Sequence, residues 1–566
     1  MASAARRRLL RERNKSSPFT FTRVYLSLLI FSSSCHLAPW GLWFEAHQAL
    51  KVTTKSMPRR SCGGAPAPPA LFTTERPVTV YDERGRKPRN SVIAPPAQSE
   101  VPVKRERILN RFEALKTELR PTLRLAGPLV LAELGWMSMA VVDTVMVGRV
   151  SPEAIAGVSL GGLVFYTAAT FGSGLLLGLD TLVSQAFGAG KLTDCHRSLV
   201  SSLYLCLCLA PALMGGIWLV APCLRSFGIH PSVLHETMPN LRALMWSTLP
   251  LLLYFAFRRY LQGMGLVRPV TFALVTANLV NALGNWVLIY GHLGAPPLGA
   301  EGSGWSTCCS RIYMAAVLVG YTLYDNRGRR AGTSKTQNAV WPNRPDLARI
   351  GQLLRLGFPA ALQLSLEVGV WATAAALASR LGPVSAAGYQ IAMITVSLTY
   401  MVPLGISAAA AVRVGHALGR DDPEGAARSG WAAILLGAAF MSCAALALLL
   451  VPRYIAGAFT LDPAVIKMGA LLLSVAALFQ LCDGLQTVAT GALRGAGDTR
   501  TPMICHLLAY WLVGLPLGYF LCFSRGWGAA GLWAGLSLAV ILIGVVLSLA
   551  WRRRVVALLG APAPAR

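Results

Sequence analysis

Charged residues are scarce in this chain of 566 residues, and acidic ones are the scarcest. Asp, Glu, Lys and Arg make up 14% of the sequence, whereas soluble proteins carry about 25%. A soluble chain of this length would also divide into separate cores, because a single core stops growing near about 250–300 residues. No such division is visible beyond residue 105. The shortage of charge therefore excludes a soluble enzyme.

Metal-binding and redox patterns are also lacking. The 12 cysteines form no CxxC pair and no His/Cys cluster, and most of them lie inside apolar segments. We interpret them as small buried hydrophobic residues. No cofactor is expected.

Apolar stretches, in contrast, are abundant. Hydrophobic residues make up 54% of the chain, and the mean hydropathy is +0.51. From Leu123 onward, stretches of about 20 or more apolar residues follow one another, which is the length that a helix needs to span a bilayer. The sequence therefore predicts an all-α polytopic membrane protein with 12 transmembrane helices. Their expected limits are 124–147, 154–187, 197–224, 238–257, 268–290, 304–324, 352–379, 385–417, 428–451, 465–493, 500–523 and 527–551.

A polar, basic connection after the sixth span divides the chain into two halves. The expected segments are a basic, disordered N-terminal extension or leader (1–105), an N-terminal six-helix bundle (106–324), a cytoplasmic linker (325–351), a C-terminal six-helix bundle (352–551) and a basic cytoplasmic tail (552–566). Three interpretations of the extension stay open. It is a transit peptide or signal-like leader, a disordered cytoplasmic tail, or a set of upstream codons wrongly included in the reading frame.

The formal net charge is +27, but its distribution argues against a nucleic-acid partner. Residues 1–100 hold 16 Lys and Arg against 6 Asp and Glu. Most of the remaining excess lies in short loops, and the loops on the side of Gly188, with the tail, carry about three times as many Lys and Arg as the opposite loops. Basic loops in membrane proteins report orientation. Both termini are therefore expected in the cytoplasm.

An internal repeat relates the two bundles. Pro128 recurs as Pro359 and Gly188 as Gly419, both at an offset of 231 residues. Further pairs keep this register to within a few residues: Leu123/Leu354, Arg124/Arg355, Leu125/Leu356, Arg149/Arg380, Pro152/Pro383, Gly157/Gly388, Gly263/Gly495, Gly265/Gly497, Arg268/Arg500, Gly299/Gly528 and Gly302/Gly531. Each half has an even number of spans, so the halves share one orientation, as in parallel repeats. We therefore expect two helical bundles that face each other across a central cavity.

Four acidic residues lie inside the expected spans, where an acid costs roughly 2.5–3.5 kcal/mol on insertion scales. Glu133 and Asp143 lie on the first span, Glu367 on the seventh and Asp483 on the tenth. Each is a candidate site for a cation or a proton, and the alternative is a buried partner that holds two helices together. Arg311 is the nearest candidate partner by depth. Asp143, Glu367 and Asp483 are the predicted coupling residues, whereas Glu133 lies nearer the inner end and could pair with a loop cation.

Polar amides accompany these acids on the fifth span. Asn278, Asn281 and Asn285 occur in TANLVNALGNW, and the last two share one helix face because they are four residues apart. Amides often form hydrogen bonds between membrane helices. An amide beside an unpaired carboxylate can also line an ion site, so both interpretations stay open.

Further polar residues mark the expected inner ends of spans. Asp180 and Gln185 lie near the end of the second span, Gln262 ends the fourth and Arg494 ends the tenth. Plain turn geometry accounts for the Gln262–Gly263 and Arg494–Gly495 pairs. For Asp180, a solvated or locally paired charge is favoured over a transport site.

These residues resemble the multidrug and toxic compound extrusion (MATE) family, in its bacterial NorM-like branch. The resemblance covers about residues 120–551, and its specificity lies in the order, spacing and twofold recurrence of the motifs. They are VVDTVMVGR around Asp143, TLVSQAFGAG after Asp180, YLQGMG, NALGNW, FPAALQLSLE ending at Glu367, VGHALG, LFQLCDGLQ around Asp483 and GALRGAGDT.

The resemblance implies a non-enzymatic antiporter that exports organic, mainly cationic, compounds in exchange for sodium ions or protons. It implies a second-half cation site at Glu367 and Asp483, which sodium could occupy, and a first-half site at Asp143 with Asn281 and Asn285. Phe479 occupies a place where some relatives carry a ligand-contacting aromatic residue.

The sequence departs from the family pattern at Glu133, where relatives more often have a neutral polar residue, and in its long N-terminus. The expected location is the bacterial inner membrane, or an organelle membrane if the N-terminus is a transit peptide. We expect a monomer.

Three rival functions are weighed against this one. A lipid-linked oligosaccharide flippase of the same superfamily carries an anionic cargo and would need a cavity lined by Arg and Lys. The four intramembrane acids here argue against such a cavity. A membrane enzyme would need a catalytic constellation, and the eight histidines form none by spacing. A channel usually needs identical subunits around a pore, whereas one chain already supplies two lobes.

Overall fold

A computed structural model describes residues 100–222, 224, 230–332 and 346–560. Within these ranges the chain is almost entirely helical and has no strand. The first helix of the described residues, α3, begins at Glu100, inside the expected N-terminal extension. The rest of that extension and much of the expected linker lie outside the described residues.

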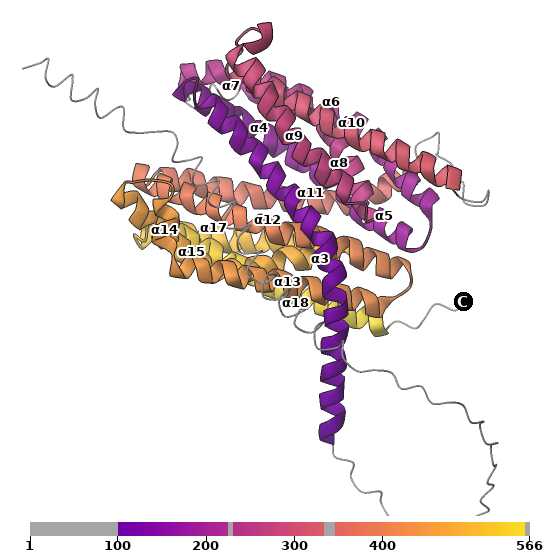
Figure 1. Cartoon of the computed structure of the whole chain (residues 1–566). Coiled ribbons are helices and arrows are strands. Elements are labelled where there is room, and N and C mark those ends of the chain that lie inside the picture. Colours follow the sequence, from indigo (N-terminus) through magenta and orange to yellow (C-terminus); the bar gives the residue numbers. More distant parts are fainter. Residues whose placement is uncertain (1–99, 223, 225–229, 333–345, 561–566) are drawn as a thin grey trace, which may run out of the picture. The chain divides into compact units, whose positions relative to one another are not determined.

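Helices α3 to α10 form the first half of the molecule, called the N-half here (Figure 1). Their bounds are α3 Glu100–Val147, α4 Pro152–Leu175, α5 Gly178–Gly188, α6 Leu192–Val220, α7 Pro231–Trp246, α8 Thr248–Gly263, α9 Arg268–Tyr290, the short η2 His292–Gly294 and α10 Ala300–Gly332.

Helices α11 to α18 form the second half, called the C-half. Their bounds are α11 Leu347–Ser379, α12 Pro383–Gly419, α13 Pro423–Leu450, α14 Pro452–Gly457, α15 Pro463–Gly495, α16 Arg500–His506, the π-helical η4 Leu507–Gly514, α17 Leu515–Tyr519, the π-helical η5 Phe520–Ser524 and α18 Ala529–Gly560.

Ten helices of the described part are long and apolar enough to cross a membrane. The other two expected spans, 238–257 and 304–324, fall on α7–α8 and on α10, which pack against each other within the N-half. The arrangement is therefore consistent with the expected twelve-helix membrane fold in two bundles.

The helix bounds reproduce the internal repeat. Helices α4 and α5 together run from Pro152 to Gly188, and α12 runs from Pro383 to Gly419, so both ends are shifted by 231 residues. Helices α8 and α15 end in matching turns, in which Gly265 has φ 78° and Gly497 has φ 83°. L-residues with a Cβ rarely adopt this left-handed conformation, which explains why glycine recurs there.

The halves differ in where their helices are interrupted. In the N-half, α4 and α5 are separated at Leu176–Leu177, and α7 and α8 meet at Ser247. Their C-half counterparts α12 and α15 are continuous. In the C-half the irregular span is the eleventh, where η4 precedes Pro516, which has no N–H to continue an α-helical hydrogen-bond ladder.

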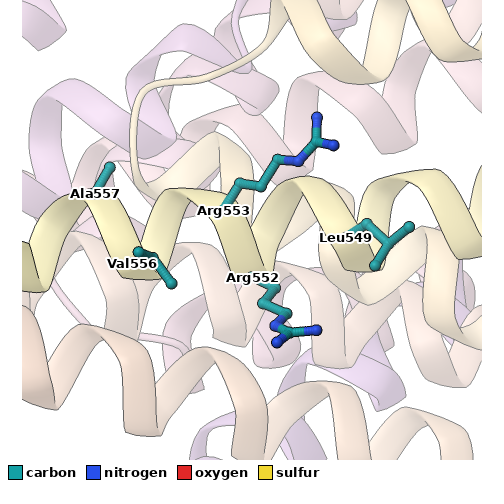
Figure 2. A pocket seen from close by; sticks show the side chains of 5 residues that line it. All are labelled: Leu549, Arg552, Arg553, Val556 and Ala557. Atoms are coloured by element: carbon teal, nitrogen blue, oxygen red, sulfur yellow. The ribbon is translucent and has the colours of Figure 1, made fainter.

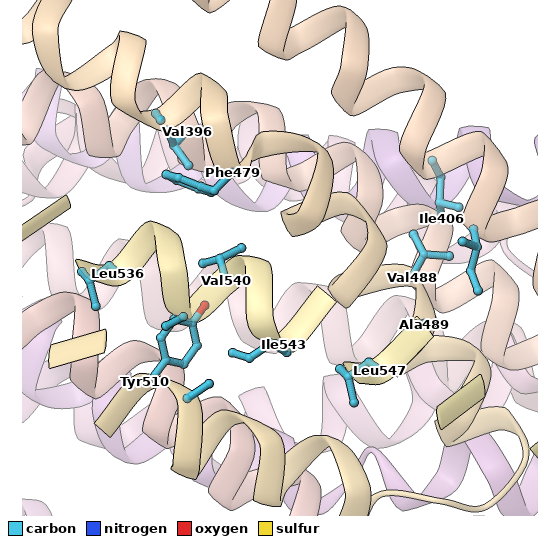
Figure 3. Packing of buried hydrophobic residues seen from close by; sticks show 14 of the residues in the cluster. Val396, Ile406, Phe479, Val488, Ala489, Tyr510, Leu536, Val540, Ile543 and Leu547 are labelled. Carbon is cyan, nitrogen blue, oxygen red and sulfur yellow. The ribbon is translucent and has the colours of Figure 1, made fainter. Parts of the chain in front are cut away.

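The buried apolar residues form one large cluster mainly in each half. In the C-half the buried cluster includes Phe479 and Val488 on α15, Tyr510 on η4 and Val540 on α18 (Figure 3). A separate cluster fills the N-half and includes Phe165 and Tyr254. Two cores joined by a contact surface provide two bodies that can move relative to each other.

The first helix of each half lies at the contact between the halves. Helix α11 packs against α4, α5 and α6 of the N-half and against α12, α16 and η4 of the C-half. Helix α3 is hydrogen-bonded to α9 and also touches α12, where the backbone of Val130 leaves no room for a Cβ at Gly405. Asp143 and Glu367 are therefore carried by the two helices that link the halves.

Candidate functional site

Asp143 lies in a polar cluster of the N-half made by α3, α9 and α10. Its Oδ1 accepts a hydrogen bond from Nδ2 of Asn285 (2.7 Å), and its Oδ2 accepts one from the Thr307 hydroxyl (2.9 Å). Nδ2 of Asn285 also lies 3.3 Å from Oδ1 of Asn281, and both asparagine side chains are fully buried. The structure thus brings together three residues that the sequence singled out, and adds Thr307.

Asn278, on the same helix as these asparagines, contacts backbone carbonyls and not the acid. Its Nδ2 donates to the carbonyl oxygen of Gly135 at 3.0 Å and to that of Leu274 at 2.9 Å. Neither bond involves an acid. This amide ties α9 to the backbone of α3.

Arg311 lies one turn beyond Thr307 on α10 and is buried. Its Nη1 donates to the Ser247 hydroxyl at 2.5 Å, and its guanidinium carbon lies 4.6 Å from the ring centroid of Phe165. Arg311 and Asp143 interact electrostatically, but they form no ion pair. The partner expected by depth is therefore near the acid without touching it.

Glu133 forms a buried ion pair with Arg258. The guanidinium of Arg258 is 2% exposed and lies inside α8, not in a loop as its place in the expected span limits suggested. The fourth span extends further than hydropathy indicated because the carboxylate neutralises this arginine. Glu133 therefore already has a fixed cationic partner, Arg258.

Glu367 lies in the C-half, with neighbours on α12 and α16. Its Oε1 lies 3.4 Å from the hydroxyl of Tyr400, and its Oε2 lies 3.8 Å from Nε2 of His506. Nδ1 of His506 lies 2.8 Å from the carbonyl oxygen of Pro502, which can only accept, so Nδ1 carries the hydrogen. In the neutral ring, Nε2 therefore has a lone pair, and it lies 3.5 Å from Nε2 of Gln363, whose N–H it can accept.

Asp483 lies on α15 near Glu367, and the two negative charges interact. Its Oδ1 accepts a hydrogen bond from Nε2 of Gln486 at 2.8 Å, and the same nitrogen lies 3.4 Å from the hydroxyl of Tyr510. In the part of the chain that the structure describes, no Arg or Lys forms an ion pair with Glu367 or Asp483. The C-half thus buries two carboxylates among neutral groups.

Phe479, one turn before Asp483, belongs to the packed core in this structure. It is 1% exposed, and its ring centroid lies 6.4 Å from that of Trp371 and 6.0 Å from that of Trp533. Its contact with substrate stays a prediction.

The polar residues at the inner span ends form a cluster between the halves. Oδ2 of Asp180 on α5 lies 3.1 Å from Nε of Arg494 on α15 and 3.4 Å from Nη1 of Arg259 on α8. The Thr181 hydroxyl donates to the Arg494 carbonyl at 2.5 Å, and Nε2 of Gln185 donates to the Gly495 carbonyl at 3.0 Å. We call these residues, Asp180, Thr181, Gln185, Arg259 and Arg494, the inter-half cluster.

This arrangement goes beyond the turn geometry expected for Arg494 and Gln262. Arg494 is buried and paired across the contact between the halves. Gln262 is 1% exposed, and neither polar atom of its amide has a hydrogen-bond partner among the described residues.

None of these residues lines the pocket in Figure 2. It has a volume of about 460 Å³ and is lined by Leu549, Arg552, Arg553, Val556 and Ala557 of α18. Within the described ranges, no group of three His, Cys, Asp or Glu is placed to hold a metal ion. The carboxylates therefore stand out by their burial among neutral groups and not by any ready-made metal cage.

Comparison with known proteins identifies the family. The family model MatE matches residues 128–287 and 359–520, one segment in each half. The chain belongs to the MatE family. The starts of the two matched segments are offset by the same 231 residues as the internal repeat.

Bacterial proteins named NorM are similar over nearly their whole length. "Probable multidrug resistance protein NorM" of Mesorhizobium japonicum is 35% identical over 446 residues, covering 78% of this chain and 94% of the relative. The protein of the same name from Brucella suis biovar 1 is 33% identical over 458 residues, with 79% and 96% covered. "Multidrug resistance protein NorM" of Burkholderia vietnamiensis is 34% identical over 447 residues, with 78% and 95% covered.

Solved MATE structures share the fold. The eukaryotic MATE transporter AtDTX14 superposes with a TM-score of 0.68 at 19% identity, covering 79% of this chain and 99% of that one. An outward-facing multidrug resistance MATE family transporter gives a TM-score of 0.69 at 19% identity, with 78% and 97% covered. This MatE-family chain thus spans nearly the whole fold of its relatives.

Sequence reasoning missed several neighbours of the acids in this MatE-family chain. Thr307, Tyr400, Gln486 and His506 were not singled out as partners of the acids, although each contacts a predicted site residue. For Thr307, one signal was available: it lies four residues before Arg311, so both occupy one face of α10.

Proposed function

We propose that this chain is a multidrug efflux antiporter that exports organic, mainly cationic, compounds in exchange for sodium ions or protons by alternating access. Membership of the MatE family and the names of its NorM relatives support the export of drugs. A helical membrane protein with bacterial relatives of this kind belongs in the bacterial inner membrane.

The observation that carries the proposal is a set of three carboxylates inside the helix bundles, none of which forms an ion pair with an Arg or Lys of the described residues. Amides and hydroxyls hold Asp143, Glu367 and Asp483, and Glu367 also lies 3.8 Å from Nε2 of His506. An uncompensated charge is costly at membrane depth and usually marks an ion or substrate path. A coupling cation that neutralises a carboxylate removes its attraction for a cationic drug. An anionic cargo would instead need buried arginines or lysines facing the path.

Alternating access is supported by where the halves touch. The inter-half cluster joins α5 to α15 at the end that contains Gly188, which the charge distribution predicts to be cytoplasmic. Coupling requires that ion and drug each prefer a different state, because a ligand that binds both states equally shifts nothing. Asp143 and Glu367, on the two helices at the contact, are well placed to sense that change.

Drug uptake into inverted vesicles or proteoliposomes tests the proposal, with sodium and pH gradients imposed separately. Asp143→Asn, Glu367→Gln and Asp483→Asn should each lower drug transport by at least about tenfold, with folded protein still in the membrane. Asn278→Ala, which removes an amide that touches no acid, is the matched control and should keep most of the transport. Undiminished transport by all three carboxylate variants would remove the basis of the mechanism.

A further inference from the structure

Arg311 is buried at the depth of the acids, and its partners are not acids. Its guanidinium donates to the hydroxyl of Ser247 and lies over the ring of Phe165. Its Nε has no hydrogen-bond partner among the described residues. A buried guanidinium normally has a carboxylate to offset the loss of its hydration. Arg311 therefore occupies a position that leaves its charge only partly compensated.

Asp143 is the carboxylate that Arg311 could reach. Thr307 touches Oδ2 of Asp143 at 2.9 Å, and Arg311 follows Thr307 by four residues on the same face of α10. One helical turn rises by about 5.4 Å, which an arginine side chain can span by changing its rotamers. The two charges are thus separated by a single hydroxyl and one turn of helix.

The present partner of Arg311 is a helix junction. Ser247 is the C-cap residue of α7 and also the N-cap residue of α8, and it is fully buried. Its hydroxyl lies 2.5 Å from the carbonyl oxygen of Leu244 and accepts from Arg311. Movement of Arg311 away from Ser247 would therefore change the support of the α7–α8 junction.

The two halves also differ in whether their buried acids have a basic residue nearby. With all groups ionised, the N-half has Glu133 paired with Arg258, and Asp143 near Arg311. The C-half has Glu367 and Asp483 with no Arg or Lys ion-paired to them among the described residues. Among these groups, Arg311 thus offsets the charge of Asp143, whereas Glu367 and Asp483 have no ion-paired Arg or Lys among the described residues.

We propose that Arg311 is a mobile internal counter-charge for Asp143. It leaves Ser247 and Phe165 and pairs with the Asp143 carboxylate in the state in which no coupling ion neutralises that carboxylate. The return of the guanidinium to Ser247 accompanies neutralisation of Asp143 and re-forms the support of the α7–α8 junction. This inference rests on the proposed function, and it makes Arg311 a positioning residue that keeps organic cations from competing for Asp143.

Two measurements on purified full-length protein test the inference: equilibrium binding of ethidium, an organic cation, by fluorescence, and ethidium turnover in proteoliposomes. Arg311→Met keeps the length of the side chain and removes the charge. It should bind ethidium about tenfold more tightly, because the carboxylate is no longer compensated, and turn over about tenfold more slowly. Arg311→Lys keeps the charge but loses the planar group that lies over Phe165, so it should stay closer to the parent protein than Arg311→Met in both measurements.

Arg242→Met is the matched control, because this arginine is exposed on α7, and it should change neither measurement. Wild-type binding and turnover in Arg311→Met would overturn the inference, as would equal defects in Arg311→Met and Arg311→Lys. If Arg311→Met does not fold, the double variant Asp143→Asn/Arg311→Met decides. Recovery of folded protein supports the pairing, and failure to recover contradicts it. Absence of ethidium export by the parent protein would contradict the proposed function, while the binding comparison would still decide the role of Arg311.

Discussion

At the scale of single residues, the four intramembrane acids divide by the charge of their neighbours. Glu133 faces the guanidinium of Arg258, whereas Asp143 is held by an amide and a hydroxyl. A carboxylate with a fixed cation is a structural element, because neither group can leave without exposing the other as a buried, uncompensated charge. A carboxylate held only by neutral donors can bind a proton or a cation reversibly, and its charge is neutralised while that ion is bound.

Glu133→Gln should therefore lower stability and not the turnover of molecules that remain folded. Breaking a buried ion pair from one side costs about 3–5 kcal/mol, because Arg258 is left buried without its partner. The double variant Glu133→Gln/Arg258→Met should cost much less. Thermal unfolding in detergent measures the stability, and drug efflux normalised to folded protein measures the turnover. Equal stability losses in the single and double variants would show that the pair is not a unit.

The sequence identified the acids because the cost of burying a charge in lipid is a property of the residue alone. It did not identify their partners, because these come from helices distant in the chain. The expected limit of the fourth span at residue 257 excluded Arg258, whereas α8 continues to Gly263 and places this arginine against Glu133. His506 faces Glu367 only because α16 packs against α11, which no local pattern reveals.

At the scale of helices, close packing depends on glycines at matched positions. Helix α18 approaches the eleventh span through Gly531 and Gly535, and the facing residues include Gly514 and Gly518. A Cβ on Gly535 would fall against the backbone of Gly518, and a Cβ on Gly514 would lie 2.7 Å from Cβ of Ala539. Small residues of this kind let membrane helices approach closely where no hydrophobic force drives them together.

Gly535→Ala should destabilise the C-half, because the added methyl group meets backbone that cannot rotate away. Overpacking of this kind costs about 1–3 kcal/mol. Gly162→Ala on α4 is the matched control: its Cβ would meet nothing within 4 Å, so the variant should be neutral or slightly more stable. The melting temperatures of the two purified variants give the comparison. A Gly535→Ala protein as stable as the control would contradict this account of the α18 contact.

The repeat predicts where helices begin and end, but not where they are interrupted. Pro152 and Pro383 start matching helices, yet only the N-half helix is divided, at Leu176–Leu177. The π-helical η4, which carries Tyr510 toward Gln486, precedes Pro516. A proline in an apolar span indicates that the backbone hydrogen-bond ladder of the helix is interrupted there. Whether the helix then kinks or forms a π-helical turn depends on how it packs against α11 and α18.

At the scale of the molecule, the two halves are joined by polar contacts at the end that contains Gly188. The inter-half cluster combines an ion pair with two hydrogen bonds to backbone carbonyls. Nε2 of His416 also donates to the carbonyl oxygen of Gly263 at 2.7 Å. The twofold layout of the halves follows from the repeat, but the state in which they meet is set by these long-range contacts and could not be predicted from the sequence.

Asp180→Asn should open the halves at this end. The substitution leaves Arg494 and Arg259, both largely buried and both within 3.4 Å of the same carboxylate oxygen, without an anion between them. Their repulsion and the cost of an uncompensated buried charge favour the state in which α5 and α15 separate. Spin labels on Lys191→Cys and Arg420→Cys, exposed positions in different halves, report the separation in a background without native cysteines.

The label distances in Asp180→Asn should gain a longer component, and Asp180→Asn/Arg494→Gln should recover part of the short one because the excess charge is removed. Glu424→Gln is the matched control: it breaks a surface ion pair with Arg428 in which both side chains are exposed, and such pairs contribute about 0–1 kcal/mol. It should leave the distances unchanged. Unaltered distances in Asp180→Asn would mean that the glycine contacts of α5 with α12, such as Gly415 against Ser184, hold the halves together without help from charge.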